Sequence, residues 1–371
     1  MKILVLGAVQ RHPNLGVSAL AEGSRAVLRR AFPGADVRFR STGTQGDGPM
    51  NLTHTTPLLR EMVENKRGLR EWTRSFNLIC DIRGGDSFTD IYTVKMLLKL
   101  SAFPFYAQRQ GAPFVMLPQT IGPFEHRATR AVARTFLRRC AVVMARDPRS
   151  ADFARELGRP ADLTATDVVF AVDQPADVQS GAHDVVLNAS GLLWQENRHV
   201  DATLYRESLR QTIDALLEQG RSVTVLAHVV GKGETGADND RTALAGLREI
   251  YGDRVAYLVP ESLAEVRRAL AAASVVIGAR MHACLNALSV GTPAIPHAYS
   301  RKFAPLLDEL GWTHTVDLVT APSAQSVVDQ TLKLVAALDR ADVEPVVTQA
   351  HARIDTVVEA LRSLEVTSSR R

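Results

Sequence analysis

Arg280 and His282 stand two residues apart, directly after an apolar run over residues 273–277 that is typical of a buried β-strand. Residues 283–290 have a helical pattern, so we expect both side chains where a strand turns into a helix. In open α/β sheets, the carboxyl ends of strands border ligand clefts, and helix N-termini attract anions. Arg280 therefore offers a cation to an anionic ligand, and His282 offers a proton-transfer group beside it.

The same two residues also have a structural interpretation. Arg280 would pair with a carboxylate, and His282 would be an ordinary hydrogen-bonded residue of the helix. For an isolated Arg-x-His pattern this interpretation is the more common one. The residues at the neighbouring strand ends must therefore decide between the two interpretations.

The composition is that of a globular protein, with 46% hydrophobic and 23% charged residues. A chain of 371 residues is too long for one ordinary core, which predicts two domains. The net charge of +4 is dispersed, which suits anionic small molecules or a membrane surface. A nucleic-acid partner is not expected, because it would require a concentrated basic stripe.

Cysteine usage and hydropathy indicate the compartment. Cys80, Cys140 and Cys284 lie in apolar patterns without pairing or metal-ligand spacing, so free thiols in a reducing cytoplasm are expected. The first apolar run, residues 3–6, is too short for the core of a signal peptide. No apolar run approaches the roughly 20 residues that a transmembrane helix needs. We expect a cytoplasmic protein, either free or peripheral at the inner face of the membrane, and leave its oligomeric state open.

Short apolar runs alternate with helical patterns along nearly the whole chain, which is typical of βαβ units with parallel strands. The candidate strands are residues 2–6, 36–40, 78–82, 113–117, 141–145 and 161–165, then 184–188, 222–227, 255–258, 274–277 and 294–297. The least periodic stretch, residues 172–181, is the expected linker. The predicted fold is two doubly wound Rossmann-like α/β domains that face each other across a cleft. They would span residues 1–175 and 182–345, with a C-terminal helix and tail over residues 346–371.

Two predicted strand ends in the first domain carry residues that suit a ligand. Gly84 and Gly85 let the backbone approach a ligand closely, backbone amides in such turns bind anions, and Asp86 is a candidate general base. Gln119 could hydrogen-bond sugar hydroxyls. The alternatives are an ordinary tight turn for the glycines and a structural loop for Gln119.

Cationic residues follow two further strands. Arg146 ends a predicted strand and is a candidate anion ligand, whereas Asp147 is expected to cap the helix that begins at Pro148. Arg301 and Lys302 open the helix after residues 294–297, where Lys302 or Arg301 could meet a phosphate near Arg280. A solvated helix end is the alternative for Lys302.

In the second domain, Asn188 and His228 close two strands and are expected to line the cleft. Asp238 and Asp240 imitate a metal-binding Asp-x-Asp pattern. They stand in a polar loop before a helix, however, so capping is the better interpretation. We predict no metal site.

Taken together, these segments resemble the polysaccharide pyruvyl transferase family over about residues 1–312. The matching pieces are Asn14-Leu15-Gly16, Gly84-Gly85, Gln119 to Pro123, Arg146-Asp147 with Ser150, Thr166-Asp167 and Gly278-Ala279-Arg280-Met281-His282, which continues through Ala287, Gly291-Thr292-Pro293 and Tyr299 to Lys302. One departure is Val17, where many relatives have an Asp after the Asn-x-Gly turn. This chain therefore has no carboxylate at the position of that Asp.

The resemblance implies a fold similar to GT-B glycosyltransferases and a reaction that moves the carboxyethylidene unit of phosphoenolpyruvate onto two hydroxyls of a saccharide, free or lipid-linked. Carried over by position, Arg280, His282 and Arg146 would form the phosphoenolpyruvate pocket, with Lys302 as a further member. The first domain would be the acceptor side and the second the donor side. The chemistry agrees, because a phosphate and a carboxylate require fixed cations and the reaction requires proton transfer, here assigned to His282. No cofactor or metal is expected.

Two other functions are compatible with parts of the sequence. A metal-independent GT-B glycosyltransferase with a nucleotide-sugar donor would have a similar segment over residues 286–293, but Asn286 stands where such enzymes often carry a Glu. A binding module without activity would not need Arg146, Arg280, His282 and Lys302 together. Asn286 and the joint presence of these four residues therefore favour pyruvyl transfer over the two other functions.

Overall fold

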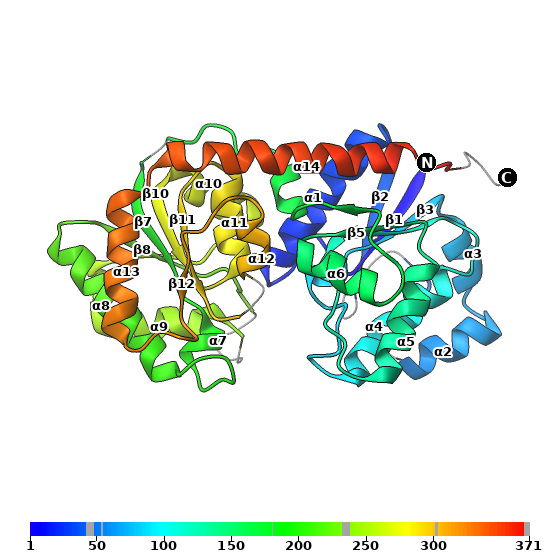
Figure 1. The fold of residues 1–371 in the computed structure, drawn as a ribbon, viewed down its shortest axis with the longest axis horizontal. Coiled ribbons are helices and arrows are strands. Elements are labelled where there is room, and N and C mark those ends of the chain that lie inside the picture. The colour runs from blue at the N-terminus through cyan, green and yellow to red at the C-terminus, as the bar shows by residue number, and fades with distance from the viewer. Residues whose placement is uncertain (42–47, 53–54, 180, 232–237, 301–302, 367–371) are drawn as a thin grey trace. The chain divides into compact units, whose positions relative to one another are not determined.

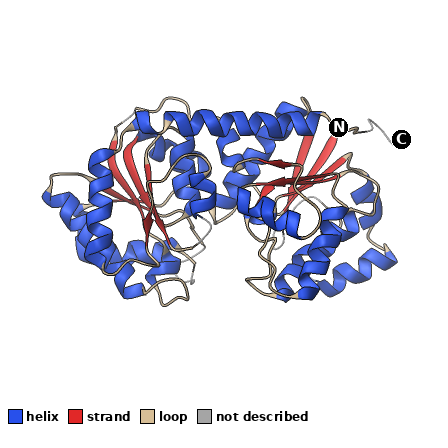
Figure 2. Cartoon of the chain, in the orientation of Figure 1, coloured by secondary structure: helices blue, strands red, loops and turns tan. Residues whose placement is uncertain are grey.

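The computed structural model describes residues 1–41, 48–52, 55–179, 181–231, 238–300 and 303–366. These residues belong to two compact units. The first unit consists of Met1–Gln10, Leu20–Ala171 and His351–Arg371, and the second consists of Arg11–Ala19 and Val172–Ala350. Each unit is built around one sheet with helices on both of its faces (Figure 2).

The first unit contains a parallel sheet of six strands in the order β2-β1-β3-β4-β5-β6. Its strands are β1 (Lys2–Leu6), β2 (Asp36–Arg40), β3 (Leu78–Asp81), β4 (Phe114–Gln119), β5 (Val142–Ala145) and β6 (Leu163–Thr164). The central strands β3 and β4 are buried along their whole length, because helices cover both faces of a parallel sheet. The strand order reverses between β1 and β3, and ligands of such sheets bind at this type of position.

The second unit also contains a parallel sheet of six strands, in the order β12-β11-β10-β7-β8-β9. Its strands are β7 (His183–Asn188), β8 (Val223–Leu226), β9 (Ala256–Leu258), β10 (Ala273–Gly278), β11 (Ala294–Ala298) and β12 (Val316–Asp317). Counted along the unit, this is the order 3-2-1-4-5-6 of the Rossmann fold, which reverses between β7 and β10. The reversal places the carboxyl ends of β7 and β10 side by side.

Helices alternate with the strands, as the sequence predicts (Figure 1). They are α1 (Leu15–Ala31), α2 (Thr55–Glu64), α3 (Leu69–Arg74), α4 (Val94–Ala107), α5 (Arg127–Arg138), α6 (Pro148–Glu156), α7 (Gly191–Trp194), α8 (Ala202–Glu218), α9 (Asp240–Tyr251), α10 (Leu263–Ala272), α11 (Met281–Ser289), α12 (Phe303–Asp308), α13 (Ala324–Ala337) and α14 (Glu344–Arg362). Short 3-10 helices cover Arg83–Gly85, Val168–Ala171, Gly252–Arg254 and Arg340–Asp342. Helices α1 and α14 contribute residues to both units.

The core of the second unit fixes the strand ends that carry the candidate site. Val185, Leu187 and Ile277 of the adjacent strands β7 and β10 are buried against Tyr205 and Leu209 of α8. Full burial of such an aliphatic side chain contributes roughly 1.5–3 kcal/mol of hydrophobic free energy. In Figure 1, α8 and α13 cover one face of this sheet, and α10 and α11 cover the other. The carboxyl ends of β7 and β10 are therefore rigid supports for the residues that follow them.

The predicted fold class is confirmed: both units are doubly wound parallel α/β sheets. The sequence prediction missed β12, which has only two residues and shows no periodicity of its own. Cys80, Cys140 and Cys284 are buried free thiols, as predicted, and burial raises the pKa of each. Among the described helices, none combines the length and the apolarity that crossing a bilayer requires.

Candidate active site

Arg280 lies at the turn from β10 into α11, which confirms the predicted change from strand to helix. The Asn188 side chain at the end of β7 holds this turn. Its Oδ1 accepts a hydrogen bond of 3.0 Å from the backbone N–H of Arg280, and its Nδ2 donates to the Leu226 carbonyl at the end of β8, also at 3.0 Å. Asn188 is buried and thus connects the ends of three adjacent strands. Its amide is occupied by these bonds rather than turned toward a ligand.

The Arg280 guanidinium is paired with two carboxylates. Nε and Nη2 donate to Oδ1 of Asp240 at 3.1 and 2.6 Å. Nη1 donates to Oδ1 of Asp238 at 2.5 Å, and Nη2 also donates to the Asp238 carbonyl at 3.0 Å. The Arg280 side chain is 9% exposed, that of Asp240 is 0% exposed, and that of Asp238 is 57% exposed. The carboxylate pairing that the structural interpretation requires is therefore present.

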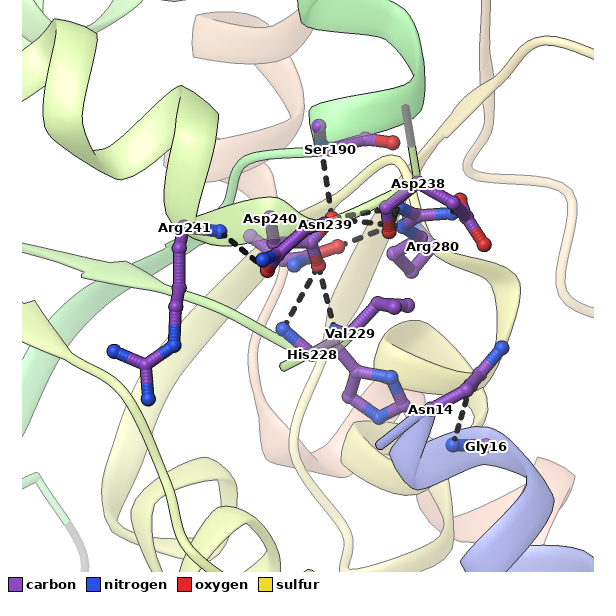
Figure 3. Close-up of polar contacts among 12 residues, drawn as sticks. Asn14, Gly16, Ser190, His228, Val229, Asp238, Asn239, Asp240, Arg241 and Arg280 are labelled. Carbon is purple, nitrogen blue, oxygen red and sulfur yellow. Dashed lines mark hydrogen bonds and ion pairs between the residues drawn. The ribbon is translucent and has the colours of Figure 1, made fainter. Parts of the chain in front are cut away.

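Asp240 contacts more than Arg280. Its Oδ1 also accepts a hydrogen bond of 2.9 Å from the N–H of Gly191, and its Oδ2 accepts bonds of 2.9 and 2.8 Å from the N–H groups of His228 and Val229. Figure 3 shows the Asp240 carboxylate between the backbone N–H groups of His228 and Val229 and the guanidinium of Arg280. Asp240 therefore joins the segments that follow β7, β8 and β10 through one buried charge.

The sequence assigned Asp238 and Asp240 to helix capping. Asn239 does cap α9, since its side chain accepts a hydrogen bond of 3.2 Å from the N–H of Arg241. The wider role of Asp240 was missed, because Gly191 lies 49 residues away and Arg280 lies 40 residues away in the chain. Only the Asp-x-Asp pattern in a loop at a strand end signalled a buried carboxylate at this position.

The two aspartates set the protonation of Arg280. Burial by itself lowers the pKa of the guanidinium, but the charges of Asp240 and Asp238 and the hydrogen bond to Asp240 outweigh it and raise the pKa above its ordinary value. Arg280 therefore carries its positive charge throughout the physiological pH range.

His228 is held at the end of β8 by both of its backbone groups. Its N–H donates to Asp240, and its carbonyl accepts a hydrogen bond of 3.1 Å from the N–H of Leu15 at the start of α1. The side chain is 1% exposed, and burial, with the charges of His282 and Arg280, lowers its pKa to about 3. Its Nε2 has no hydrogen-bond partner among the described residues. A neutral imidazole therefore stands beside Arg280 and His282.

His282 is the second residue of α11 and is half-buried. The first turn of α1 lies against it: a Cβ added to Gly16 would lie 2.9 Å from both Cβ and Cγ of His282. Asn14 shapes this turn, because its Oδ1 accepts a hydrogen bond of 2.9 Å from the N–H of Gly16 (Figure 3). Gly16 is therefore the residue whose small size permits the contact with His282.

Arg146 belongs to the first unit, at the end of β5, where it has partners of its own. Its Nη1 donates to Oδ2 of Asp167 at 3.0 Å, and its Nη2 donates to Oγ1 of Thr120 at 2.6 Å. The side chains of Arg146 and Asp167 are 1% and 0% exposed. A Cβ added to Gly85 would lie 3.3 Å from Nη1 of Arg146. Arg146 therefore supports the turn over residues 83–85, and its charge is neutralised inside the protein.

Gly84, Gly85 and Asp86 follow β3, at the position where the strand order of the first unit reverses. The N–H of Gly84 donates to the Gly7 carbonyl after β1 at 2.8 Å, and Gly84 and Gly85 have φ angles of 62° and 82° that favour glycine. Asp86 is partly exposed and accepts a hydrogen bond of 2.9 Å from the Tyr92 hydroxyl.

Gln119 differs from its prediction. It is the last residue of β4 and is fully buried, and its Nε2 donates to the Asp81 carbonyl at 2.9 Å. It was expected in a loop, within reach of sugar hydroxyls. Asp147, in contrast, caps α6 as predicted and accepts a hydrogen bond of 2.8 Å from the N–H of Ser150. Lys302 and Arg301 lie outside the described residues.

The structure thus brings four predicted residues together in the second unit: Asn188, His228, Arg280 and His282. This arrangement combines a fixed cation, a partly exposed imidazole and a neutral buried imidazole at the strand reversal. Within the described part of the chain, no three His, Cys, Asp or Glu side chains gather as metal ligands. The arrangement thus contains a guanidinium that is already paired with two carboxylates, beside a half-buried imidazole of the kind that can transfer a proton.

Comparisons with known proteins agree with this architecture. The model of the family described as polysaccharide pyruvyl transferase matches residues 14–301. A structure of a putative UDP-N-acetylglucosamine 2-epimerase from Listeria monocytogenes is similar, with a TM-score of 0.61 and 9% identity, over 100% of this chain and 98% of that one. The UDP-GlcNAc 2-epimerase of Neisseria meningitidis has a TM-score of 0.58 and 11% identity, over 97% and 99% of the two chains. Sucrose-phosphate synthase from Thermosynechococcus elongatus has a TM-score of 0.53 and 14% identity, over 98% and 96%. These structures share the GT-B-like fold.

Proposed function

The chain belongs to the polysaccharide pyruvyl transferase family, and on this premise we propose that it transfers the carboxyethylidene group of phosphoenolpyruvate onto two hydroxyls of a sugar. Membership makes the chain a transferase with a saccharide acceptor. The proposal adds the donor, the ketal product in a glycan or glycolipid, and the residues that act.

The observation that carries the proposal is the position of Arg280 and His282 where the second sheet reverses its strand order. Phosphoenolpyruvate carries a phosphate and a carboxylate, and a guanidinium suits both through paired hydrogen bonds. The second unit is therefore the donor side in this proposal. Arg280 binds one anionic group of the donor, and Asp240 fixes the plane of the guanidinium.

The reaction requires protons to be moved in a set order. Protonation of the methylene carbon of phosphoenolpyruvate turns it into a methyl group and leaves an electron-poor carbon at C2. A sugar hydroxyl attacks C2 and loses its proton, the C–O bond to phosphate breaks, and a second hydroxyl closes the ring. One hydroxyl proton balances the proton delivered to the methyl group, and the other leaves with the phosphate.

His282 is the residue we assign to proton transfer. It is half-buried, and the charges of both His282 and Arg280 act on the buried imidazole of His228, so the three side chains are near one another. An imidazole can give a proton to the methylene carbon and take one from a hydroxyl near neutral pH, which accelerates such steps by roughly 10²–10⁴-fold. His228, neutral beside it, offers a hydrogen bond without adding charge.

In the first unit, the acceptor side of this proposal, Asp86 is the candidate base for the acceptor hydroxyl because its carboxylate is partly exposed at the strand reversal. The ion pair of Arg146 with Asp167 supports an indirect role, in which Arg146 positions the Gly84–Gly85 turn. Gln119 is fully buried, so in this proposal it also has an indirect role: it helps to hold the strand end that precedes the Gly84–Gly85 turn.

A nucleotide-sugar glycosyltransferase is the alternative. The similar solved structures establish only the fold, since their identities are 9–14%. Asn286, which stands where such enzymes often carry a ribose-binding Glu, is buried: its Nδ2 donates to the His282 carbonyl at 2.7 Å, and its Oδ1 accepts from Arg267 at 3.1 Å. Because both ends of the Asn286 amide bind protein groups, this side chain does not replace a ribose-binding carboxylate, which favours pyruvyl transfer over glycosyl transfer.

The experiment that tests the proposal follows the donor carbon. The protein is incubated with phosphoenolpyruvate labelled with ¹³C at its methylene carbon and with a panel of hexosides and N-acetylhexosaminides. The proposal predicts that the methylene signal is replaced by a methyl signal of a ketal and that an equal amount of phosphate is released. Transfer from a UDP or GDP sugar, with no change in labelled phosphoenolpyruvate, would support the alternative.

A further inference from the structure

Arg280 has two carboxylate partners of very different character. Asp240 is fully buried and accepts hydrogen bonds from three backbone N–H groups as well as from the guanidinium. The side chain of Asp238 is 57% exposed, and the described contact of its carboxylate with Arg280 is one hydrogen bond to Nη1. The buried partner is therefore fixed by its surroundings, and the exposed partner can be exchanged at low cost.

The charges around Arg280 do not favour an anionic ligand in this arrangement. Asp238 and Asp240 carry two negative charges against the one positive charge of Arg280, and His228 is neutral because burial lowers its pKa. Figure 3 shows the Arg241 guanidinium pointing away from this group. An anion that approached Nη1 would meet the carboxylate of Asp238, and two like charges about 4 Å apart repel each other appreciably even near the surface.

We propose that Asp238 is an exchangeable counter-ion that occupies the ligand-facing edge of Arg280 and competes there with an anionic group of the donor. This inference rests on the proposed function for the identity of that donor. Binding of a phosphate or carboxylate group replaces the hydrogen bond from Nη1 to Asp238, while the bonds from Nε and Nη2 to Asp240 persist. Asp238 thus sets the affinity of the site for anions, and Asp240 sets its geometry.

The exchange also has a consequence for product release. When the anion leaves, Asp238 regains its hydrogen bond with Nη1, so the guanidinium is not left without a partner at that edge. This compensation keeps the site from holding its anion too tightly. An aspartate at position 238 therefore weakens binding of both the donor and the phosphate that is released.

The test measures anion binding by calorimetry in Asp238→Asn and in a matched control, Asp184→Asn. Asp184 also forms an ion pair, with Arg221 at 2.5 Å, but it lies near the amino-terminal end of β7, whereas the site lies at the carboxyl ends of the strands. Two probes are titrated separately, phosphoenolpyruvate and inorganic phosphate. Asparagine retains the shape of the aspartate and removes its charge.

We expect Asp238→Asn to lower the dissociation constant of each anion by at least fivefold at low salt, with a smaller gain at high salt because exposed charges are screened. Asp184→Asn should leave both constants within twofold of the wild type. If Asp238→Asn binds both anions no better than the wild type, or more weakly, Asp238 does not compete for Arg280 and the inference is wrong. If no variant binds phosphoenolpyruvate but phosphate follows the expected pattern, the inference holds and the proposed donor is wrong.

Discussion

Asp240 and Arg280 form a buried ion pair between the start of α9 and the end of β10, in which one carboxylate oxygen accepts hydrogen bonds from Nε and Nη2 at 3.1 and 2.6 Å. Burial of both charges costs solvation free energy, so such a pair does not by itself make a fold stable. It does fix the orientation of the guanidinium. Asp240, the first residue of α9, therefore determines which edge of Arg280 is left for another partner.

Replacing Asp240 by Asn should destabilise the second unit strongly. The variant leaves Arg280 as a buried charge without its main partner and turns an amide toward donors, which costs about 3–5 kcal/mol of unfolding free energy. Urea unfolding measures the loss. Asp184→Asn is the control, and it should lose less than about 1 kcal/mol because its pair with Arg221 is partly exposed. Equal stability of Asp240→Asn and the wild type would contradict the structural role of the buried pair.

Replacing His282 by Ala should remove turnover and leave donor binding intact. His282 moves protons in the proposed reaction, and loss of such a group costs roughly 10²–10⁴-fold in kcat. The dissociation constant of phosphoenolpyruvate should stay within about threefold, because Arg280 still binds the anion. Steady-state kinetics and calorimetry separate the two effects. A variant with normal kcat would exclude His282 from the proton transfers.

Gly16→Ala tests the contact between α1 and His282. The added Cβ would lie 2.9 Å from Cβ and Cγ of His282, so the imidazole must shift by several tenths of an ångström. Such crowding costs about 1–3 kcal/mol, and misplacement of the imidazole should lower kcat by about tenfold. The matched variant Val17→Ala, at the next position, should keep kcat within twofold. Equal kcat values for the two variants would show that the position of His282 does not depend on Gly16.

Stability of the second unit should fall as the pH drops from 7 to 5. Burial lowers the pKa of His228 to about 3 and that of His297 to about 4, whereas an unfolded histidine has a pKa near 6.5. Between these values the unfolded chain binds more protons than the native state, so the unfolding free energy rises with pH over this window. The stabilisation that the two neutral histidines give the native state is fully present above pH 6.5, and it is lost as the pH falls toward their native pKa values.

At pH 5, the lowered pKa values of His228 and His297 should each reduce the unfolding free energy by about 2 kcal/mol relative to pH 7. Urea unfolding across this range measures the slope. His297→Gln offers a clean comparison, because a glutamine amide can replace the hydrogen bond of Nε2 to Thr331, and His297 does not belong to the candidate site. The variant should show a shallower slope than the wild type. An unchanged slope would mean that His297 is already protonated, or titrates normally, in the native state.

Much of the fold was predictable from local pattern. Within the described residues, the apolar runs of parallel strands and the helical periodicity between them identify every strand except β12. The turn from β10 into α11 follows from the same signals. Arg280 and His282 are therefore located correctly without tertiary information. Asp147 was also predictable, since capping depends only on the residues that follow it.

The partners of these residues were not predictable, because they come from distant strands. Arg146 is neutralised by Asp167, which lies 21 residues further along the chain, and Gln119 is buried beside Asp81, 38 residues before it. The role of Asp240 could not be predicted for the same reason, because its hydrogen-bond donors follow three different strands. Sequence spacing indicates which chemistry is available, whereas strand order decides which charges face a ligand.

The central claim, that phosphoenolpyruvate is the donor, is tested most directly by a thermal-shift titration with phosphoenolpyruvate, in parallel with UDP and GDP sugars. A ligand that binds only the native state adds about 2.7 kcal/mol of stability at 100 times its dissociation constant. We predict a rise in Tm with phosphoenolpyruvate alone, which Arg280→Ala abolishes. A rise in Tm with a nucleotide sugar and none with phosphoenolpyruvate would contradict the proposed function and assign the site to a glycosyl donor.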